Sequence, residues 1–343
     1  MKTVADNKCP SCGASISFNP TTQKWDCAYC GSSFGIEEFE KMQGKEEITQ
    51  SNVEIDEYTC PDCGAALITD ANTVATHCVY CGNTTIMKNR LQEEFKPDKI
   101  IPFKKQKDEA IKAYQLNVKK KWFAPSDFHK KENIEKISGV YIPFWLYDCY
   151  TNGTINANAE KIRYWSDSNY NYKETEIYNC VRSGELEITD LPVDGSTKFE
   201  DDIMDSIEPY NYSEFKEFNR AYLSGFLAEK YDLSSNDVYK RAEERVKNTL
   251  ENELKESIKG YSSVTVRNSN INVQKGDVEY ALLPVWMMNI KYKDKKYTFA
   301  MNGQTGKVVG NVPIDYGKMI WKSALCFGIA FVVCFIIGFM GGY

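Results

Sequence analysis

Residues 9–31 read CPSCGASISFNPTTQKWDCAYCG, and residues 60–82 read CPDCGAALITDANTVATHCVYCG. The two stretches are identical at ten of 23 positions, which include all the cysteines. Each stretch holds two C-x₂-C pairs separated by fourteen residues, and this is the spacing of a zinc ribbon. Each pair forms a tight turn that aims two thiolates at one point, so two turns complete a tetrahedron. The eight predicted zinc ligands are Cys9, Cys12, Cys27, Cys30, Cys60, Cys63, Cys78 and Cys81.

Both predicted metal sites are of the structural kind. Four thiolates fill the tetrahedral coordination of Zn²⁺ and leave no position for water or a substrate. His77 lies beside Cys78, but the four cysteines of that site already complete the coordination. A disulfide framework is the alternative, and it is disfavoured because no secretory segment precedes Cys9 and the doubled spacing is typical of metal sites. We therefore expect two structural Zn²⁺ ions, one in each ribbon.

The C-terminal residues 323–343 read SALCFGIAFVVCFIIGFMGGY and contain no charge. A helix rises about 1.5 Å per residue, so this run can cross the roughly 30 Å hydrocarbon core of a bilayer. A buried core helix is the alternative, but the run is apolar on all sides. Lys318 and Lys322 precede it, with Trp321 between them, and basic residues favour the cytoplasmic side. We predict a single-pass cell-membrane protein, anchored by residues 319–343, with its N-terminal body in the cytoplasm, where reducing conditions keep the thiols free for zinc.

The pattern of the whole chain predicts an α+β protein with antiparallel sheets and one long helix. Its expected domains are zinc ribbon 1 at residues 1–35, an acidic linker at 36–57, zinc ribbon 2 at 58–90, a body at 91–315 and the anchor at 319–343. The expected body elements are helices at 107–121 and 236–259, strands at 140–159 (with a turn at Asn152-Gly153) and 172–189, and a meander of strands at 264–273, 278–283, 285–292 and 296–301.

Two segments of the body resemble each other. Residues 139–150 read GVYIPFWLYDCY, and residues 279–292 read EYALLPVWMMNIKY. We interpret them as related strand units in which Trp145 and Trp286 anchor the core, since large aromatic side chains are most often buried. A pocket for a cofactor or a peptide at these tryptophans is the alternative.

Charge is distributed unevenly along the body. Residues 96–136 contain twelve lysines and six acidic residues, whereas residues 185–217 contain eleven acidic residues and two lysines. The two stretches are expected to face each other. The acidic stretch also offers ligands for a hard cation, although it lacks the order of an EF-hand loop, and an acidic surface is the simpler interpretation. The acidic residues in question are Glu200, Asp201, Asp202, Asp205 and Glu208.

The sequence predicts neither an enzyme nor a nucleic-acid-binding protein. It holds two histidines without a catalytic triad around either, and residues 302–307 (NGQTGK) lack the first glycine and the final Ser or Thr of a phosphate-binding loop. The chain carries a net charge of −6, and the cysteine-rich stretches are close to neutral. Affinity for DNA depends on neutralising phosphates, so an acidic chain is poorly suited to it. No small-molecule substrate is expected.

Several strings together resemble a known family. They are the paired C-P-x-C-G-A ribbons, YIPFWLYD, PVDGSTKFEDDIMDSIEPY, LLPVWMM, FAMNGQTGKVVG and the terminal apolar run. They resemble bacterial membrane-anchored proteins with transcription-factor-IIB-type zinc ribbons, which are often labelled primosomal-helicase-like. The helicase label does not transfer, because this chain has no nucleotide-binding loop. The resemblance implies partners among flotillin-like and phage-shock-type envelope-stress proteins.

These observations predict a non-enzymatic, membrane-tethered adaptor that recruits cytoplasmic proteins through its ribbons. Phe18, Trp25 and Val74 are the candidate partner-binding side chains on the ribbon edges, and the alternative is that they cover the ribbons' own small cores. A nucleic-acid-binding ribbon protein tethered to the membrane is the second functional hypothesis.

Overall fold

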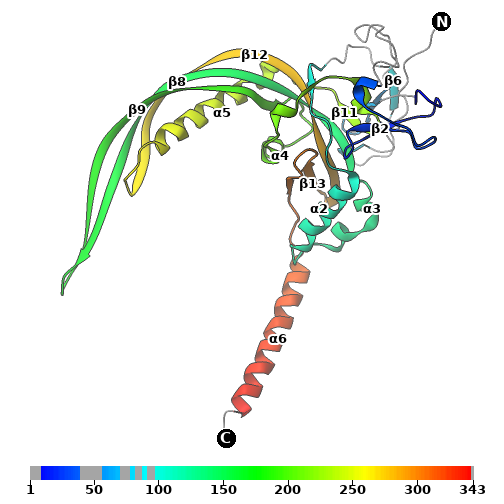
Figure 1. The fold of residues 1–343 in the computed structure, drawn as a ribbon. Coiled ribbons are helices and arrows are strands. Elements are labelled where there is room, and N and C mark those ends of the chain that lie inside the picture. Colours follow the sequence, from blue (N-terminus) through cyan, green and yellow to red (C-terminus); the bar gives the residue numbers. More distant parts are fainter. Residues whose placement is uncertain (1–8, 39–55, 70–77, 82–86, 91–96, 341–343) are drawn as a thin grey trace.

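The computed structural model describes residues 9–38, 56–69, 78–81, 87–90 and 97–340. It is a mixed α+β structure with antiparallel sheets, as the sequence predicts. A long curved sheet extends from one side of the body, and a single helix, α6 (Tyr316–Met340), leaves the body from below (Figure 1).

Three long strands form the curved part of the sheet, which we call the arch. They are β8 (Ser138–Ser166), β9 (Asn171–Asp194) and β12 (Ser263–Tyr292), and β8 pairs antiparallel with both of the others. Figure 1 shows them bending together away from the body. Alternate residues of β8, such as Ile155, Ala157 and Ala159, are fully buried on the inner face, so the arch has a core of its own.

The predicted turn at Asn152-Gly153 is wrong. Strand β8 passes straight through these residues, and Gly153 lies between Gly184 of β9 and Ile271 of β12. A Cβ atom at Gly153 would lie 2.6 Å from Cγ1 of Ile271. The glycine therefore allows close packing inside the sheet and does not mark a hairpin.

The predicted meander at 264–292 is also wrong, because these residues form the single strand β12. The pairing with β8 shifts between Lys275 and Val278, and this irregularity contains Gly276. A Cβ atom on Gly276 would lie 2.9 Å from the Asp148 carbonyl oxygen. The break that the sequence places between residues 273 and 278 is therefore a β-bulge within one strand and not a turn between two strands. The last predicted strand is confirmed as β13 (Lys295–Asn302), and Asn302-Gly303 begins the turn that leads to β14 (Val308–Gly310).

Helix α5 (Ser235–Glu256) packs on the inner face of the arch (Figure 1). The helix predicted at 236–259 is confirmed, and its apolar stripe is buried: Val238, Ala242, Val246, Leu250 and Leu254 all face the core. The N-cap is Ser234, and Asp237 completes a reciprocal capping box. The helix stabilises the arch because its stripe buries β8 and β9 side chains along several turns.

An aromatic core lies where the arch joins the body. The rings of Phe103 and Phe226 stack with their centroids 4.2 Å apart, and Trp286 packs against both. The indole N–H of Trp286 donates to the carbonyl of Lys105 at 2.8 Å, so its role as a core anchor is confirmed. Trp145 is half-buried and donates to the Leu233 carbonyl at 2.9 Å. The resembling segments are antiparallel neighbours within β8 and β12.

The remaining body elements complete the mixed architecture. The predicted basic helix is confirmed as α2 (Lys107–Lys119). The other helices are η1 (Ser126–His129), α3 (Lys131–Ile134), α4 (Asp201–Ile207), η2 (Tyr212–Glu214) and η3 (Arg220–Leu223). The other body strands are β7 (Lys99–Ile100), β10 (Lys216–Glu217) and β11 (Leu227–Glu229).

Candidate metal centres

The first zinc ribbon is a small three-stranded sheet that carries one four-cysteine group. Its strands are β1 (Ser17–Asn19), β2 (Lys24–Asp26) and β3 (Ser33–Phe34). Gly13 and Gly31 follow the two cysteine turns with φ of 73° and 75°, a conformation that glycine adopts without strain. The sulfurs of Cys9 and Cys30 are 3.5 Å apart, and those of Cys12 and Cys27 are 3.6 Å apart.

The second ribbon repeats this geometry. Its strands are β4 (Asp56–Thr59), β5 (Ala66–Thr69) and β6 (Met87–Arg90). The sulfurs of Cys60 and Cys81 are 3.5 Å apart, and those of Cys63 and Cys78 are 3.6 Å apart. The two metal groups predicted from the sequence are thus both assembled in space. His77 lies outside the described residues.

The sulfur positions fit a four-coordinate metal. Zinc–thiolate bonds of about 2.3 Å in a tetrahedron place neighbouring sulfurs about 3.8 Å apart, close to the observed values. A disulfide would bring two sulfurs to about 2.05 Å, and all eight cysteines are free. The ligand atoms of each group lie within 4.8 Å of one another. Each group can therefore hold a zinc-like ion with a complete set of four protein ligands.

The local environment favours the thiolate form at one exposed ligand. The Ser32 hydroxyl lies 3.2 Å from the Cys30 sulfur, and this contact, together with the Ser32 backbone, lowers the pKa of Cys30 to about 6. Burial instead raises the pKa of Cys78 in the second ribbon. Metal binding must displace the protons of such thiols, so loading of both centres is expected to be coupled to proton release.

Ribbon 1 is docked on the body through the aromatic residues expected at its free edge. Trp25 is fully buried, and its indole N–H donates to the Ala221 carbonyl of η3 at 2.8 Å. Phe18 packs edge-on against Tyr222, with the ring centroids 5.3 Å apart. The expectation that Phe18 and Trp25 are open to a partner is therefore wrong, because the body covers both. Val74, the third expected edge residue, lies outside the described residues.

Ribbon 2 is part of the body sheet. Its strand β5 pairs antiparallel with β11, and β11 pairs parallel with β8. Tyr80, in the second cysteine turn, packs against Phe199 of the body, with the ring centroids 5.2 Å apart. Main-chain pairing and side-chain packing therefore both attach this ribbon to the body.

The two ribbons differ sharply at one repeated tyrosine. Tyr29 and Tyr80 occupy the same position of the second cysteine turn in their respective repeats. Tyr80 is 2% exposed, whereas Tyr29 is 84% exposed. The second turn of ribbon 2 is thus part of the core, and that of ribbon 1 projects into solvent.

A buried carboxyl group lies beneath ribbon 2, and sequence reasoning did not identify it. Glu229, on β11, is 2% exposed and accepts a hydrogen bond from the Ser196 hydroxyl at 2.8 Å. Its Oε2 atom accepts no hydrogen bond of good geometry from a described residue, and the buried Tyr80 hydroxyl lies close enough to interact with the carboxyl group. Burial raises the pKa of Glu229 to about 8. No local sequence signal marks this residue, because its burial depends on β11 lying between ribbon 2 and β8.

The acidic stretch is neutralised mainly by arginines of α5. Arg241 contacts Asp194 at 2.6 Å and Asp201 at 2.9 Å, and Arg245 contacts Glu208 at 2.9 Å. Among the residues that the structure describes, the His, Cys, Asp and Glu groups close enough to hold a metal are the two cysteine clusters. The structure therefore favours an arginine-paired acidic surface over the cation-site alternative.

The basic and acidic stretches face each other in part. Lys99 lies 3.5 Å from Asp190, and Lys104 lies 2.6 Å from Glu214. These partly exposed pairs contribute little stability individually.

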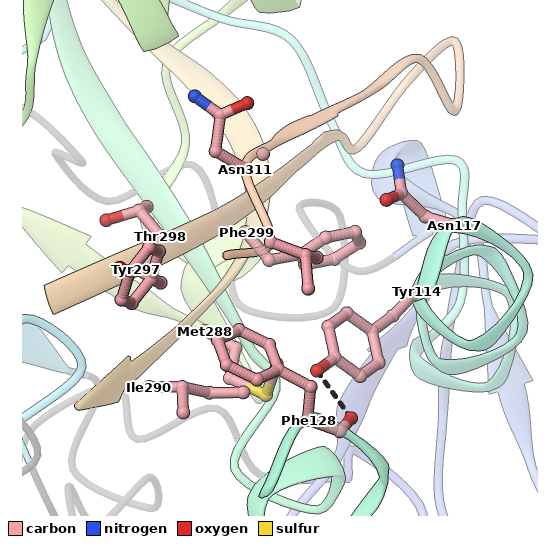
Figure 2. A pocket seen from close by; sticks show the side chains of 11 residues that line it. Tyr114, Asn117, Phe128, Met288, Ile290, Tyr297, Thr298, Phe299 and Asn311 are labelled. Carbon is pink, nitrogen blue, oxygen red and sulfur yellow. Dashed lines mark hydrogen bonds between the residues drawn. The ribbon is translucent and has the colours of Figure 1, made fainter. Parts of the chain in front are cut away.

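One hollow in the body is lined by apolar and aromatic side chains (Figure 2). Among the described residues, its lining contains no Asp, Glu, His, Lys, Arg or Cys, and the Tyr114 hydroxyl donates to the Phe128 carbonyl at 2.7 Å. Of the side-chain types that serve as general acids or bases, the described lining offers tyrosines alone.

Helix α6 is long and apolar enough to cross a membrane. The most apolar 18-residue stretch within Tyr316–Ile337 has a mean hydropathy of 2.3 and is not buried anywhere in the protein. This exposure argues against the buried-core alternative. The helix begins at Tyr316, before the predicted anchor, and its first turns are held by hydrogen bonds from Lys318 to the Ala124 carbonyl and from Lys322 to the Trp122 carbonyl, both 2.8 Å.

The fold and the sites define an α+β protein with two four-cysteine centres and one C-terminal helix that can span a membrane. The chain is 38% identical over 340 residues to a protein of Bacillus subtilis (strain 168) named "Uncharacterized protein YdjG", and the match covers 99% of both chains. The chain belongs to the family of that protein. No family model matches the chain, and no solved structure matches it.

Proposed function

We propose that the protein is a non-enzymatic adaptor that holds a cytoplasmic protein at the cell membrane. Helix α6 provides the anchor within residues 319–343, and two structural Zn²⁺ ions hold the ribbons rigid. Four cysteine ligands per centre leave no coordination position for a substrate, and the described lining of the hollow in Figure 2 holds no carboxyl, imidazole, amine or thiol group. Flotillin-like and phage-shock-type envelope-stress proteins are the partner classes suggested by the sequence resemblance.

The observation that carries this proposal is the exposure of Tyr29. Ribbon 2 uses the equivalent Tyr80 to pack on the body, so its cysteine turn is not free for a partner. Ribbon 1 packs on the body through Trp25 and leaves Tyr29 projecting beside its metal ligands. Tyrosine is enriched among the residues that dominate protein–protein binding energy. Ribbon 1 is therefore the surface that we assign to the partner.

The orientation in the membrane follows from charge. Lys318 and Lys322 lie at the N-terminal end of α6, and basic residues next to a span remain on the cytoplasmic side. The ribbons then lie in the cytoplasm, whose reducing conditions keep cysteines available for zinc.

The test compares the full chain with its Tyr29→Ala variant after crosslinking in cells and purification from membranes. The variant should keep two zinc ions and its membrane location but lose the protein partner that the wild type retains. The matched control is Tyr178→Ala, which removes a tyrosine that is 42% exposed on β9 and should leave the partner bound.

Equal partner recovery with wild type and Tyr29→Ala would refute the role of ribbon 1. The nucleic-acid hypothesis would replace the adaptor if the full chain bound DNA with Kd below about 1 μM at physiological salt. Deleting residues 1–90 is a poorer test, since it would also remove β4, β5 and β6 from the body sheet.

A further inference from the structure

The end of the arch is a free two-stranded hairpin, which we call the hairpin tip (residues 161–176). The pairing of β12 with β8 ends at Glu160, opposite Ser263, while β8 and β9 continue together to Ser166 and Asn171. All residues from 163 to 175 are exposed. An isolated two-stranded hairpin is only marginally stable in water, so a further contact would stabilise this extension of the sheet.

Aromatic side chains are concentrated on both faces of the hairpin tip. Tyr164 is 72% exposed, Trp165 50%, Tyr170 67% and Tyr172 39%. The rings of Trp165 and Tyr172 stack across the strands at 5.5 Å with an interplanar angle of 12°. Strand neighbours point to opposite faces, so Tyr164 and Trp165 present aromatic surface on the two sides of the hairpin. A surface that covered all of these rings would have to reach both faces of the hairpin.

The turn of the tip is ordered by Asp167. One carboxylate oxygen accepts hydrogen bonds from the backbone N–H groups of Asn169 and Tyr170, both at 2.8 Å, and the other accepts from the Tyr172 hydroxyl at 2.9 Å. The backbone bonds, to Asn169 first, hold the pKa of Asp167 below its ordinary value. These three local hydrogen bonds would replace bonds to water if the Asp167 carboxylate were partly dehydrated.

The charge of the tip does not oppose a membrane surface. Three basic residues, Lys161, Arg163 and Lys173, balance three acidic ones, so the formal net charge of residues 161–176 is zero. The acidic residues are Asp167, Glu174 and Glu176.

Both the arch and α6 extend toward the same side of the protein. Figure 1 shows β8 and β9 curving down from the body, with α5 on the inner side of the curve, while α6 also runs downward. Exposed aromatic residues also surround the start of α6: Tyr316 (66% exposed) and Trp321 (70%) lie on the helix, and Trp122 (71%), which follows α2, lies beside it. The Lys322 ammonium group lies 5.5 Å from the ring centre of Trp122. Tyrosine, tryptophan and lysine are the residues enriched where a span meets the headgroups.

We propose that the hairpin tip rests in the headgroup region of the bilayer that holds α6. Tyr164, Trp165, Tyr170 and Tyr172 enter the interface, where an aromatic ring and a polar N–H or O–H are both satisfied. A bilayer surrounds an inserted hairpin on both faces, whereas a docked protein typically covers one. This inference rests on the membrane anchoring by α6 proposed above.

The second membrane contact has a consequence for the adaptor. A single helix leaves a body free to rotate and tilt, but two separated contacts fix its orientation. The ribbon strands β2 and β6 lie on the side of the body opposite to the direction of α6 (Figure 1), so ribbon 1 is then held away from the bilayer. The arch thereby keeps the proposed partner-binding surface directed into the cytoplasm.

The test places the photo-reactive residue p-benzoylphenylalanine at Tyr170 of the full chain. The protein is reconstituted in vesicles of phosphatidylcholine and phosphatidylglycerol and irradiated, and lipid adducts are quantified by mass spectrometry. Tyr316, at the start of α6, serves as the positive control. Tyr150, which is 38% exposed on β8 beside the inward-facing Cys149 and therefore on the outer face of the arch, serves as the negative control.

We expect lipid adducts at Tyr170 comparable to those at Tyr316 and at least about tenfold above those at Tyr150. Burying one aromatic side chain in the bilayer favours the inserted state by about this factor. The same reagent at Tyr164 should also label lipid, because the bilayer covers both faces.

Adducts at Tyr316 without adducts at Tyr170 would overturn the second contact and leave the anchor intact. Absence of lipid adducts at Tyr316 would instead refute the anchoring itself. Adducts from Tyr170 to a second copy of the chain or to another protein would assign the tip to a protein interface and overturn the inference.

Discussion

Replacing Trp25 by alanine should detach ribbon 1 from the body without emptying its metal centre. Trp25 is fully buried against η3 and donates to the Ala221 carbonyl at 2.8 Å. Truncating a buried tryptophan costs about 3–5 kcal/mol. At about 1.4 kcal/mol for each tenfold change, the open state of this contact should become between about 10² and 4 × 10³ times more populated. The zinc ion should remain, because folding within a ribbon is tied to its own four ligands.

Hydrogen–deuterium exchange of the full chain in detergent measures this opening locally. Amides of η3, residues 220–223, should exchange faster in Trp25→Ala by that factor, while amides of α5 stay unchanged. The matched control is Trp25→Phe, which keeps an aromatic ring and loses the indole N–H, and its effect should be about tenfold, equivalent to one hydrogen bond. Unchanged exchange in η3 with Trp25→Ala would refute the docking of ribbon 1.

Three other measurements test separate parts of the account. Glu229 has a pKa of about 8 in the folded protein and an ordinary value near 4.5 when unfolded, so its protonated form stabilises the fold fully below pH 4.5, and this contribution is lost as the pH rises to 8. The wild type should therefore lose up to about 5 kcal/mol of folding stability over this pH range through Glu229, and Glu229→Gln should not show this loss. Melting temperatures that change with pH in the same way for variant and wild type between pH 5 and 9 would contradict this prediction. Arg241→Ala leaves the buried Asp194 without its ion pair and should cost about 3–5 kcal/mol, whereas adding Asp194→Asn should restore much of it; equal denaturation midpoints for Arg241→Ala and wild type would count against this. Truncation after residue 315 should release the protein to the soluble fraction, and a truncated chain that resists carbonate washing would place the anchor elsewhere.

Features that depend on local sequence were predictable. The cysteine spacing alone selects the ligands of each centre, because the turns that aim the thiolates are made by neighbouring residues. The apolar stripe of α5 follows from helical periodicity, although the helix ends at Glu256, three residues before its predicted end. The apolar run of α6 predicts a membrane span from its length and composition alone.

Features that depend on distant residues were missed or reversed. Asn152-Gly153 carries a hairpin signal, but the strands on both sides of β8 keep the chain extended there. Trp25 and Phe18 look like free ribbon edges until η3, nearly 200 residues later in the chain, covers them. Neither Tyr29 nor Tyr80 can be classified from its identical local motif, because only the body decides which tyrosine is buried.

The most direct test of the account is the metal content of the full chain purified in detergent. We predict two zinc ions per chain, and one per chain when Cys9 is replaced by serine, since Cys60 belongs to a separate centre. The Cys9→Ser protein should remain in the membrane fraction but lose the partner that ribbon 1 holds. One ion or none in the wild type, or iron with the red colour of a four-thiolate iron site, would contradict the assignment of two structural zinc ribbons.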